Sequence, residues 1–471
     1  MSGFKRTLSL NTTIALVIGG VIGSGIFMKP ALMASQLGSP LLLISVWIVA
    51  GIITLFGALS NAEVAAMFPE TGGQYVFFKK MYGDAFAFLY GWAAFSVFNT
   101  AGNASIAYVF SQYANYFVEL PHFSVAIEKS YTFHIPLVGN IFPLENFGVK
   151  MLTVFLILIL TAVNYLSVAY GGALQRVLTA LKAIAIVLLI FGILFSGKGS
   201  VHNIVTSMPS MPHGWDLIGA YMAAIAGAFW AYDGWNNITF VAGEIKDPQR
   251  NIPKSLFFGL SFCIIIYVLV NLAYIYVLPI DKMALSTFVA SDSATVTWGL
   301  IGGGIIAAMV MLSTLGSANS NVLATARVTY AMSEENRLFA WAGKPQKRFN
   351  TPGNALILNA AWTIILILSG SFDMLTDMLI FVSWFFYGMS GLGVFLLRKK
   401  MHDTPRFYKV WGYPIVPLFF VAFVGFFLCS TLYTDINNYR NGTAPIINSV
   451  LGAIITCIGI PIYYLSKKKK S

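Results

Sequence analysis

The sequence is poor in charged residues and in cysteine. Only 10% of its 471 residues are charged and 57% are hydrophobic, whereas a soluble domain has about 25% charged and roughly 45–50% apolar residues. This composition argues against a soluble enzyme, a disordered chain and a nucleic-acid-binding domain, which needs a basic exposed face. The three cysteines, Cys263, Cys429 and Cys457, lie inside apolar runs and form no metal-binding or disulfide pattern.

Familiar catalytic patterns are missing as well. The five histidines fall in expected loops without HExxH spacing, and no Walker A, GxSxG or kinase signature occurs. We therefore expect no metal, no cofactor and no enzymatic activity. A membrane-bound enzyme or a ligand sensor is a remote alternative, because the sequence offers neither a cluster of reactive groups nor a sizeable polar segment for a soluble output domain.

Long apolar runs dominate the sequence. About 20 apolar residues cross a bilayer as a helix, and these runs are too evenly apolar for the alternating strands of a membrane barrel. The pattern predicts an all-α multi-pass membrane protein with twelve transmembrane helices. We expect them near 11–36, 40–66, 84–117, 148–166, 173–196, 215–242, 254–279, 294–327, 353–371, 373–397, 412–433 and 444–466.

The positive charges are unevenly distributed between the loops. With the N-terminus inside, 22 of the 29 Lys and Arg residues face the cytoplasm, and two more, Lys29 and Lys182, fall within spans; the other five, on the outer side, are Lys129, Lys150, Lys198, Lys282 and Arg440. Cytoplasmic loops carry an excess of Lys and Arg, so both termini are predicted to be cytoplasmic, in a plasma (cell inner) membrane protein. The net charge of +11 then needs no nucleic acid partner; the bilayer and a small-molecule substrate are the expected partners.

The chain divides into two similar halves within a single transmembrane domain, residues 1–471. The first five spans (11–196) and the next five (215–397) each begin with a Gly-interrupted span, and two helices follow near 412–466. An odd number of spans in each half implies inverted topology. Paired broken helices at corresponding positions point to a transporter site.

The first broken span contains Ile22, Gly23, Ser24, Gly25 and Ile26. Glycine weakens a helix by about 1 kcal/mol per residue relative to alanine, so this segment can unwind in the membrane. Its free N–H groups would then bind a carboxylate. The alternative is close helix packing through small residues.

The second broken span contains Trp230, Ala231, Asp233, Gly234 and Trp235. A carboxylate inside the bilayer costs about 2.5–3.5 kcal/mol even on permissive scales, so Asp233 requires a partner or a wet cavity. It either favours a cationic group of the substrate or ties the broken helix to its own backbone. We interpret Trp230 as a lid over the substrate.

Lys182 lies about two turns inside the fifth span, too deep for easy snorkelling. An intramembrane lysine is a functional candidate. Its ammonium can take the place of a bound cation and bridge the unwound carbonyls of the first span and a hydroxyl of the eighth, such as that of Ser317. A merely snorkelling lysine is the alternative.

Several motifs together resemble the amino acid–polyamine–organocation superfamily and, within it, the L-type amino acid transporters of bacterial type. They are Ile22–Phe27, Trp230–Asn236, Gly243–Pro248, Gly316–Asn319 with Ala326–Arg327, Thr351–Pro352, and the lysine at 182. The resemblance implies a LeuT-type fold, in which two inverted five-helix repeats are followed by two extra helices. It also implies amino acid transport by alternating access, usually as obligatory exchange.

The resemblance further implies roles for single residues. Gly23, Ser24 and Gly25 would bind the substrate carboxylate, the backbone around Trp230–Asp233 the ammonium, and Lys182 would make transport independent of sodium. Animal members pair with a heavy chain through a cysteine in the loop after the third span; residues 118–147 contain none, so no disulfide-linked heavy chain is expected. We predict a sodium-independent exchanger of neutral L-amino acids. The alternatives are a proton- or sodium-coupled symporter of this fold, or an exchanger of cationic amino acids or cystine.

Overall fold

The computed structural model describes residues 6–69, 72–166, 181–335, 339–344, 346 and 351–468. The start of the fifth predicted span (173–180) and part of the inner loop near 328–352 lie outside the described residues. Most of the described residues are helical, and the only strands among them form one short hairpin. The described chain is therefore mostly helical, as the sequence predicts, with one short hairpin as the exception.

The elements follow one another as a succession of helices joined by short loops. In order they are α1 (Leu10–Val21), α2 (Gly25–Leu37), α3 (Pro40–Met67), α4 (Gly73–Tyr82), α5 (Asp84–Ala93), the π-turn η1 (Ala94–Asn99), α6 (Thr100–Ala114), α7 (Val125–Ser130), β1 (Phe133–Ile135), β2 (Gly139–Ile141), α8 (Phe147–Leu166), the π-turn η2 (Leu188–Gly192), α10 (His202–Val205), α11 (Gly214–Tyr232), the 3₁₀ segment η3 (Trp235–Glu244), α12 (Pro248–Val277), α13 (Ile280–Ala284), α14 (Val289–Glu335), α15 (Gly353–Ser369), α16 (Phe372–Lys400), α17 (Ile415–Arg440), α18 (Asn448–Cys457) and α19 (Gly459–Lys468).

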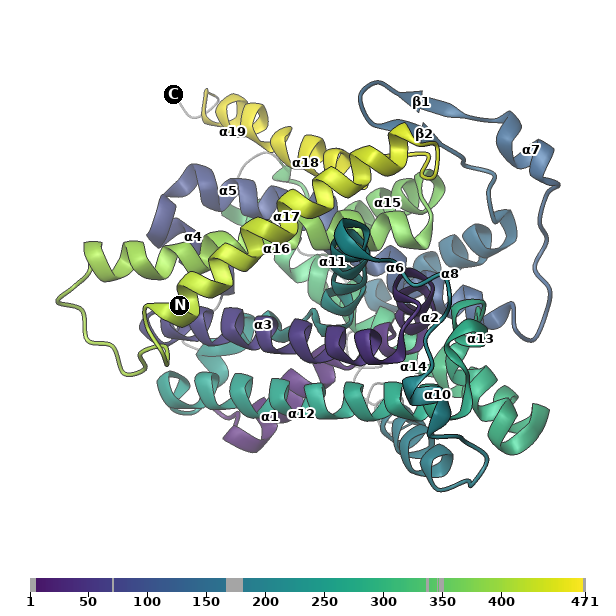
Figure 1. Ribbon diagram of the computed structural model, residues 1–471. Coiled ribbons are helices and arrows are strands. Elements are labelled where there is room, and N and C mark those ends of the chain that lie inside the picture. The colour runs from purple at the N-terminus through teal and green to yellow at the C-terminus, as the bar shows by residue number, and fades with distance from the viewer. Residues whose placement is uncertain are drawn as a thin grey trace.

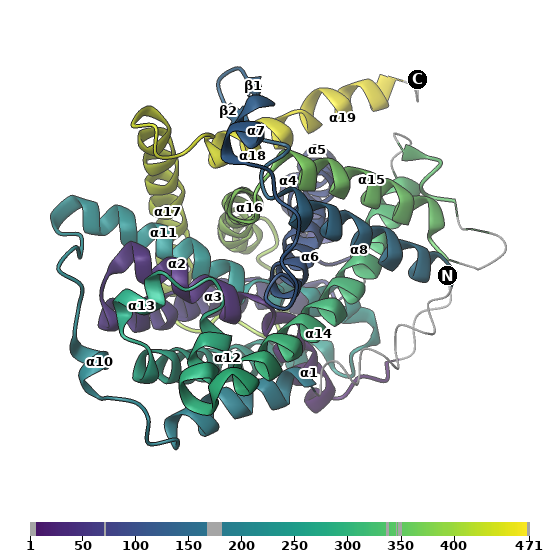
Figure 2. The same cartoon turned by 90° about the vertical axis from the view of Figure 1, so that its right-hand side faces the viewer.

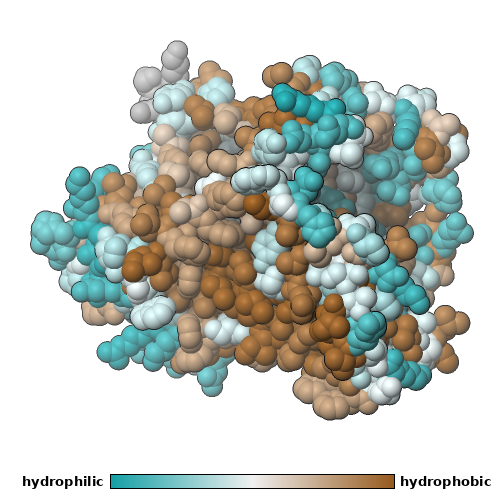
Figure 3. Space-filling view, viewed as in Figure 1, coloured by the Kyte–Doolittle hydropathy of each residue, from teal (hydrophilic) through white to brown (hydrophobic). Residues whose placement is uncertain are grey.

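Seven helical segments of the described chain are long and apolar enough to cross a membrane, and an eighth is added when the bent pair α1 and α2 is taken as one span. They are α3, α8, α12, α14, α16, α17 and the pair α18–α19. Hydrophobic residues form a broad band across the middle of the molecule, with hydrophilic residues gathered towards its two ends (Figure 3). The chain is therefore a multi-pass membrane protein.

The structure also contains features that the apolar pattern does not reveal. The eighth predicted span is part of the long helix α14, which is bent at Gly299, where φ is +74°. The loop after α6 carries the antiparallel hairpin β1–β2, in which Phe133 pairs with Ile141. We call the end of the molecule that carries this hairpin and α13 the hairpin end (Figure 1). The hydropathy pattern does not reveal the hairpin because it is short and polar, nor the bend because it results from a single glycine conformation.

The helices pack in two groups, and the broken segments belong to the first. One group joins α1 and α3 to α12, and α2 to α11; the other joins α6 to α8, α14 and α15. Helix α16 contacts α3, α6 and α11 and lies near the centre of the helices in the end-on view of Figure 2. Segments from both halves of the sequence thus line the space between the groups.

A buried ion cluster ties α3 to the far end of α16. Glu63 is 1% exposed, and Arg398 donates two hydrogen bonds to it, of 2.9 and 2.7 Å, from Nε and Nη2. The guanidinium of Arg406 lies 3.4 Å away, and the N–H of Val410 donates to the same carboxylate. Because bidentate Arg–carboxylate pairs with further hydrogen bonds offset the cost of burial, this cluster anchors α16.

Candidate functional site

The first break separates α1 from α2. Helix α1 ends at Val21, α2 begins at Gly25, and the two axes differ by 45°. The first N–H groups of a helix have no intrahelical acceptor, and the Ser24 hydroxyl does not cap them. Gly23, Ser24 and Gly25 all line the cavity described below. The turn therefore presents backbone donors and the positive end of a helix dipole to that cavity.

The second break follows α11. Asp233 is extended, with φ −66° and ψ 157°, and Gly234 has φ +99°. A residue with a side chain rarely adopts such a positive φ, so glycine is the residue that permits this turn. The chain then continues as η3 towards the end opposite the hairpin end. The break leaves the last carbonyls of α11 without their helical donors.

The two breaks touch each other. A Cβ atom at Gly25 would lie 2.6 Å from both Cα and Cβ of Ala231, and one at Gly234 would lie 2.5 Å from the carbonyl oxygen of Gly20. The hydroxyl of Tyr267, on α12, lies 2.9 Å from the carbonyl oxygen of Val21 and 2.8 Å from that of Ala231. These glycines are thus required by close backbone packing, and a buried tyrosine holds both breaks in register.

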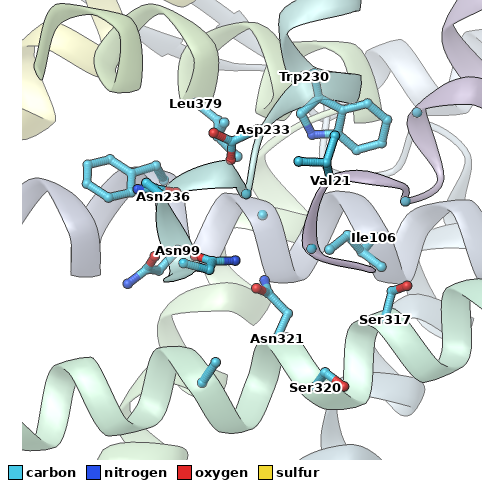
Figure 4. A pocket seen from close by; sticks show the side chains of 18 of the residues that line it. Val21, Asn99, Ile106, Trp230, Asp233, Asn236, Ser317, Ser320, Asn321 and Leu379 are labelled. Carbon is cyan, nitrogen blue, oxygen red and sulfur yellow. The ribbon is translucent and has the colours of Figure 1, made fainter. Parts of the chain in front are cut away.

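A cavity of about 240 Å³ lies where the breaks meet. This is somewhat smaller than the roughly 300–1,000 Å³ of pockets for drug-sized ligands, and so suits a ligand of amino acid size. The breaks, α6, α14 and α16 all contribute to its walls. Figure 4 shows Trp230, Val21 and Ile106 on one side and Asn99 and Asn236 on the other, with Asp233 between them.

Lys182 lies behind the first break. Its ammonium donates a 2.7 Å hydrogen bond to the carbonyl oxygen of Ile22 and a 3.1 Å bond to Oγ of Ser317 on α14. The side chain is only 7% exposed. One buried positive charge thereby links the helix that carries Lys182, the break and α14.

Asp233 faces the cavity from the second break. Its Oδ1 accepts a 2.7 Å hydrogen bond from the hydroxyl of Tyr387 on α16. Among the described residues that line the cavity, Asp233 is the only one with a charged side chain. Tyr387 and the backbone N–H of Gly234 thus orient the carboxylate, and its remaining lone pairs can face a cationic group of a ligand.

A compact barrier closes the cavity towards the hairpin end. The ring of Trp230 meets that of Phe372 edge to face at 5.2 Å. Lys29, which is 1% exposed, donates to Oδ1 of Asp373 at 2.7 Å and to Thr376 at 2.9 Å. Its ammonium also lies 4.7 Å from the centre of the Phe372 ring. This barrier joins α2 to α16 beside the ring of Trp230.

The opposite direction is more open. Residues of α1 and η3 on that side, including Gly19, Gly20 and Phe240, line the cavity, and Asn237 is exposed. The structure therefore shows a cavity that is closed towards the hairpin end and faces the other end.

The residues singled out from sequence take three kinds of position. Those that line the cavity are Ile22, Gly23, Ser24, Gly25, Trp230, Ala231, Asp233, Gly234 and Ser317. Lys182 contacts the break from behind. Ile26 is fully buried in the first turn of α2, and Trp235 packs against Tyr387 at 5.0 Å. Neither lines the cavity, and their contact with substrate stays a prediction.

Other important residues were not found from sequence. They are Tyr267, Tyr387, Lys29, Asp373, and the polar lining residues Asn99, Ser320 and Asn321. Most of them come from helices other than the broken ones. A polar residue in an apolar run was the available signal, but sequence alone does not say which such residues share one depth and one face.

Comparison with known proteins places this geometry in a family. The model of the family described as "Amino acid permease" matches residues 8–460. A serine/threonine exchanger, SteT, of Bacillus subtilis is 30% identical over 475 residues, which covers 100% of this chain and 99% of that protein.

Two mammalian proteins are similarly related. The mouse large neutral amino acids transporter small subunit 2 is 30% identical over 98% of this chain and 81% of its own length. The human cystine/glutamate transporter is 29% identical over 98% of this chain and 85% of its own length. With broken helices around a cavity of amino acid size and a family match over nearly its whole length, the chain belongs to the amino acid permease family and is a membrane transporter, not an enzyme.

Proposed function

We propose that the chain exchanges neutral L-amino acids across the cell membrane, independently of sodium, by alternating access. The observation that carries the proposal is the cavity between the two helix breaks, with the Lys182 ammonium on the carbonyl of Ile22. A fixed ammonium at this point supplies the positive charge that a bound cation would otherwise supply. The Bacillus subtilis relative is named as a serine/threonine exchanger, which supports exchange as the mode of transport.

The substrate's two charged ends suit the two breaks. Its carboxylate accepts hydrogen bonds from the N–H groups at Gly23, Ser24 and Gly25, at the positive end of α2. Its ammonium lies against the last carbonyls of α11 and the carboxylate of Asp233. A carbonyl oxygen has two lone pairs, so the bond from Tyr267 to Ala231 leaves room for a second donor.

In this proposal the hairpin end is the outer side. Twelve spans, arranged as two inverted five-helix repeats and two extra helices, place both termini in the cytoplasm, and the 22 positive residues on that side support this orientation. The cavity then faces the cytoplasm, and Trp230, Phe372 and the Lys29–Asp373 pair form the closed outer barrier. Alternating access requires that barrier to open while the inner half-helices α1 and η3 close.

We also propose that the transporter works without a disulfide-linked subunit. One mammalian relative is named as a small subunit, but residues 118–147 of this chain contain no cysteine. Oxidising and reducing gels of the protein in its native membrane test this, because a linked partner would appear as a heavier band that reduction removes.

Transport in liposomes tests the proposed function. Purified protein is reconstituted with or without internal amino acids, and uptake of labelled L-amino acids is measured with sodium and pH gradients of either sign. Exchange predicts uptake that requires internal amino acid and ignores both gradients. Uptake into empty liposomes driven by sodium or protons would establish the ion-coupled symporter instead. A preference for arginine, lysine or cystine would establish the exchanger of cationic amino acids or cystine.

A further inference from the structure

One wall of the cavity consists of amide and hydroxyl groups. Asn99 comes from η1, Asn236 from η3, and Ser320 and Asn321 from α14. We call these four residues the amide wall. Among the described residues, the side chains of Asn99, Asn236 and Ser320 have no hydrogen-bond partner in the protein, although each lines the cavity.

The π-turn η1 determines which residues of its span face the cavity. Its wider turn is marked by a 2.8 Å hydrogen bond from the Thr100 hydroxyl to the carbonyl of Phe95, five residues back. The indole N–H of Trp362, on α15, donates a 2.8 Å bond to the carbonyl of Ser96 in the same turn. Such single π-turns occur frequently at functional sites. Asn99 is the last residue of this turn and faces the cavity rather than the helix packing.

A chain of buried hydrogen bonds orients Asn321. Nδ2 of Asn103 donates to Oγ1 of Thr325 at 3.0 Å, and Nδ2 of Asn321 donates to Oδ1 of Asn103 at 2.8 Å. Because its amide nitrogen is engaged in this chain, Asn321 directs a carbonyl oxygen, an acceptor, to the cavity. The wall therefore offers a positioned acceptor beside the two-sided amides of Asn99 and Asn236 (Figure 4).

The other parts of the cavity are assigned to the two charged groups of the substrate, so the amide wall remains for its side chain. In the proposed function the first break takes the carboxylate, and Asp233 with the end of α11 takes the ammonium. The opposite wall carries Trp230, Val21 and Ile106. The nearby hydroxyl of Ser317 already accepts a hydrogen bond from Lys182. The amide wall carries no charge, so it neither compensates nor requires a charged side chain.

We propose that the amide wall is the subsite for the substrate's side chain and that it selects a primary carboxamide, as in L-asparagine and L-glutamine. This inference rests on the proposed function and names the substrate class of the same site. A primary carboxamide has two N–H donors and an oxygen with two lone pairs, so it can pair with Asn321 and with an asparagine amide at once. A substrate with a hydroxyl side chain offers only one donor. A substrate with an aliphatic side chain would expel water and leave the polar groups of the wall unpaired, and polar sites reject such ligands strongly.

The test compares substrates and variants in the same liposomes. Uptake of labelled L-glutamine into liposomes preloaded with L-glutamine is measured against unlabelled glutamine, serine, leucine and alanine. The proposal predicts that glutamine competes about tenfold or more better than leucine, since each lost hydrogen bond costs several-fold in affinity. It also predicts that glutamine competes better than serine.

Two substitutions make the test specific. Asn99→Leu keeps the size of the side chain, and is expected to lower the ratio of glutamine uptake to alanine uptake about tenfold, because the side chain of alanine is too short to pair with the wall. An unchanged melting temperature in detergent shows that the variant is folded. Asn438→Leu, at an exposed asparagine of α17 outside the cavity, is the matched control and should leave glutamine uptake unchanged.

Three outcomes overturn the proposal. They are leucine or serine competing as well as glutamine in the wild type, an Asn99→Leu variant that handles glutamine normally, and a variant that loses alanine and glutamine equally. Each of these leaves amino acid exchange intact as a function. If the wild type transports no amino acid at all, the proposed function itself fails.

Discussion

Removing the charge of Lys182 is the sharpest test of the proposed mechanism. The ammonium makes two hydrogen bonds, at 2.7 Å to the Ile22 carbonyl and at 3.1 Å to the Ser317 hydroxyl. In Lys182→Met the side chain keeps similar length and loses both donors. The first break then loses the group that holds its carbonyl towards α14.

The magnitude follows from the groups left behind. Methionine also removes the cost of burying an ammonium, so the net effect is smaller than the two charged hydrogen bonds together. What remains is a buried carbonyl without its donor, which costs about 1–3 kcal/mol. At about 1.4 kcal/mol per factor of ten, this is a loss of roughly fivefold to somewhat more than a hundredfold. Ser317→Ala removes only the longer contact and should reduce exchange less than tenfold.

The assay is exchange of labelled substrate in liposomes, with equal amounts of protein that elutes as one peak and retains its melting temperature in detergent. The predicted order of activity is wild type, then Ser317→Ala, then Lys182→Met, with Lys182→Ala at least as impaired. Near-wild-type exchange in Lys182→Met would refute a role for this charge in the transport cycle. A reversed order would show that Ser317 acts independently of the lysine.

Three further predictions concern the rest of the site. Asp233→Gly should change which side chains are accepted more than it changes expression, and an unchanged substrate profile would leave Asp233 a purely structural acid. Asp373→Ala removes the carboxylate that pairs with the buried ammonium of Lys29, at a cost of about 1–3 kcal/mol, and should loosen the barrier at the hairpin end. In the proposed orientation, a membrane-impermeant thiol reagent added outside should then react faster with a cysteine introduced into the cavity. An unaltered rate would contradict the barrier. Gly25→Ala places a Cβ 2.6 Å from Ala231. This overpacking should cost about 1–3 kcal/mol of folding stability and lower both the melting temperature and the exchange rate. Gly425→Ala, where no atom lies within 4 Å of the added Cβ, should lower neither, and equal behaviour of the two variants would contradict the close approach.

The two helix breaks could be located from sequence because their cause is local. Glycines next to polar residues in an apolar run weaken a helix wherever it lies, and α1 ends at Val21 and α11 at Tyr232, inside the segments expected to unwind. The buried lysine stood out for the same reason: a charge in the middle of an apolar run is costly enough to need an explanation. The position of the Trp235 ring was not foreseen: after the turn at Gly234 it packs against Tyr387 and does not line the cavity.

The partners of these residues depended on the fold. Asp233 and Tyr387 are 154 positions apart, and Lys29 and Asp373 are 344 apart, and neither pair has a spacing that a sequence pattern could reveal. The inward orientation of Asn99 depends on the π-turn η1, which apolar periodicity does not predict.

By itself, the sequence determined that this chain is a membrane protein, that two of its helices break, and that a few charged residues lie within membrane-spanning segments, where burying a charge costs free energy. Those properties follow from the free energy of transferring each residue from water to lipid and from the helix propensity of glycine, both of which act locally. Only the tertiary structure decided which segments meet: that the breaks touch through Gly25 and Ala231, that Lys182 reaches Ile22 and Ser317, and that the cavity is closed towards the hairpin end. These contacts join residues far apart in the chain, and their geometry is set by helix packing, which composition and periodicity do not encode.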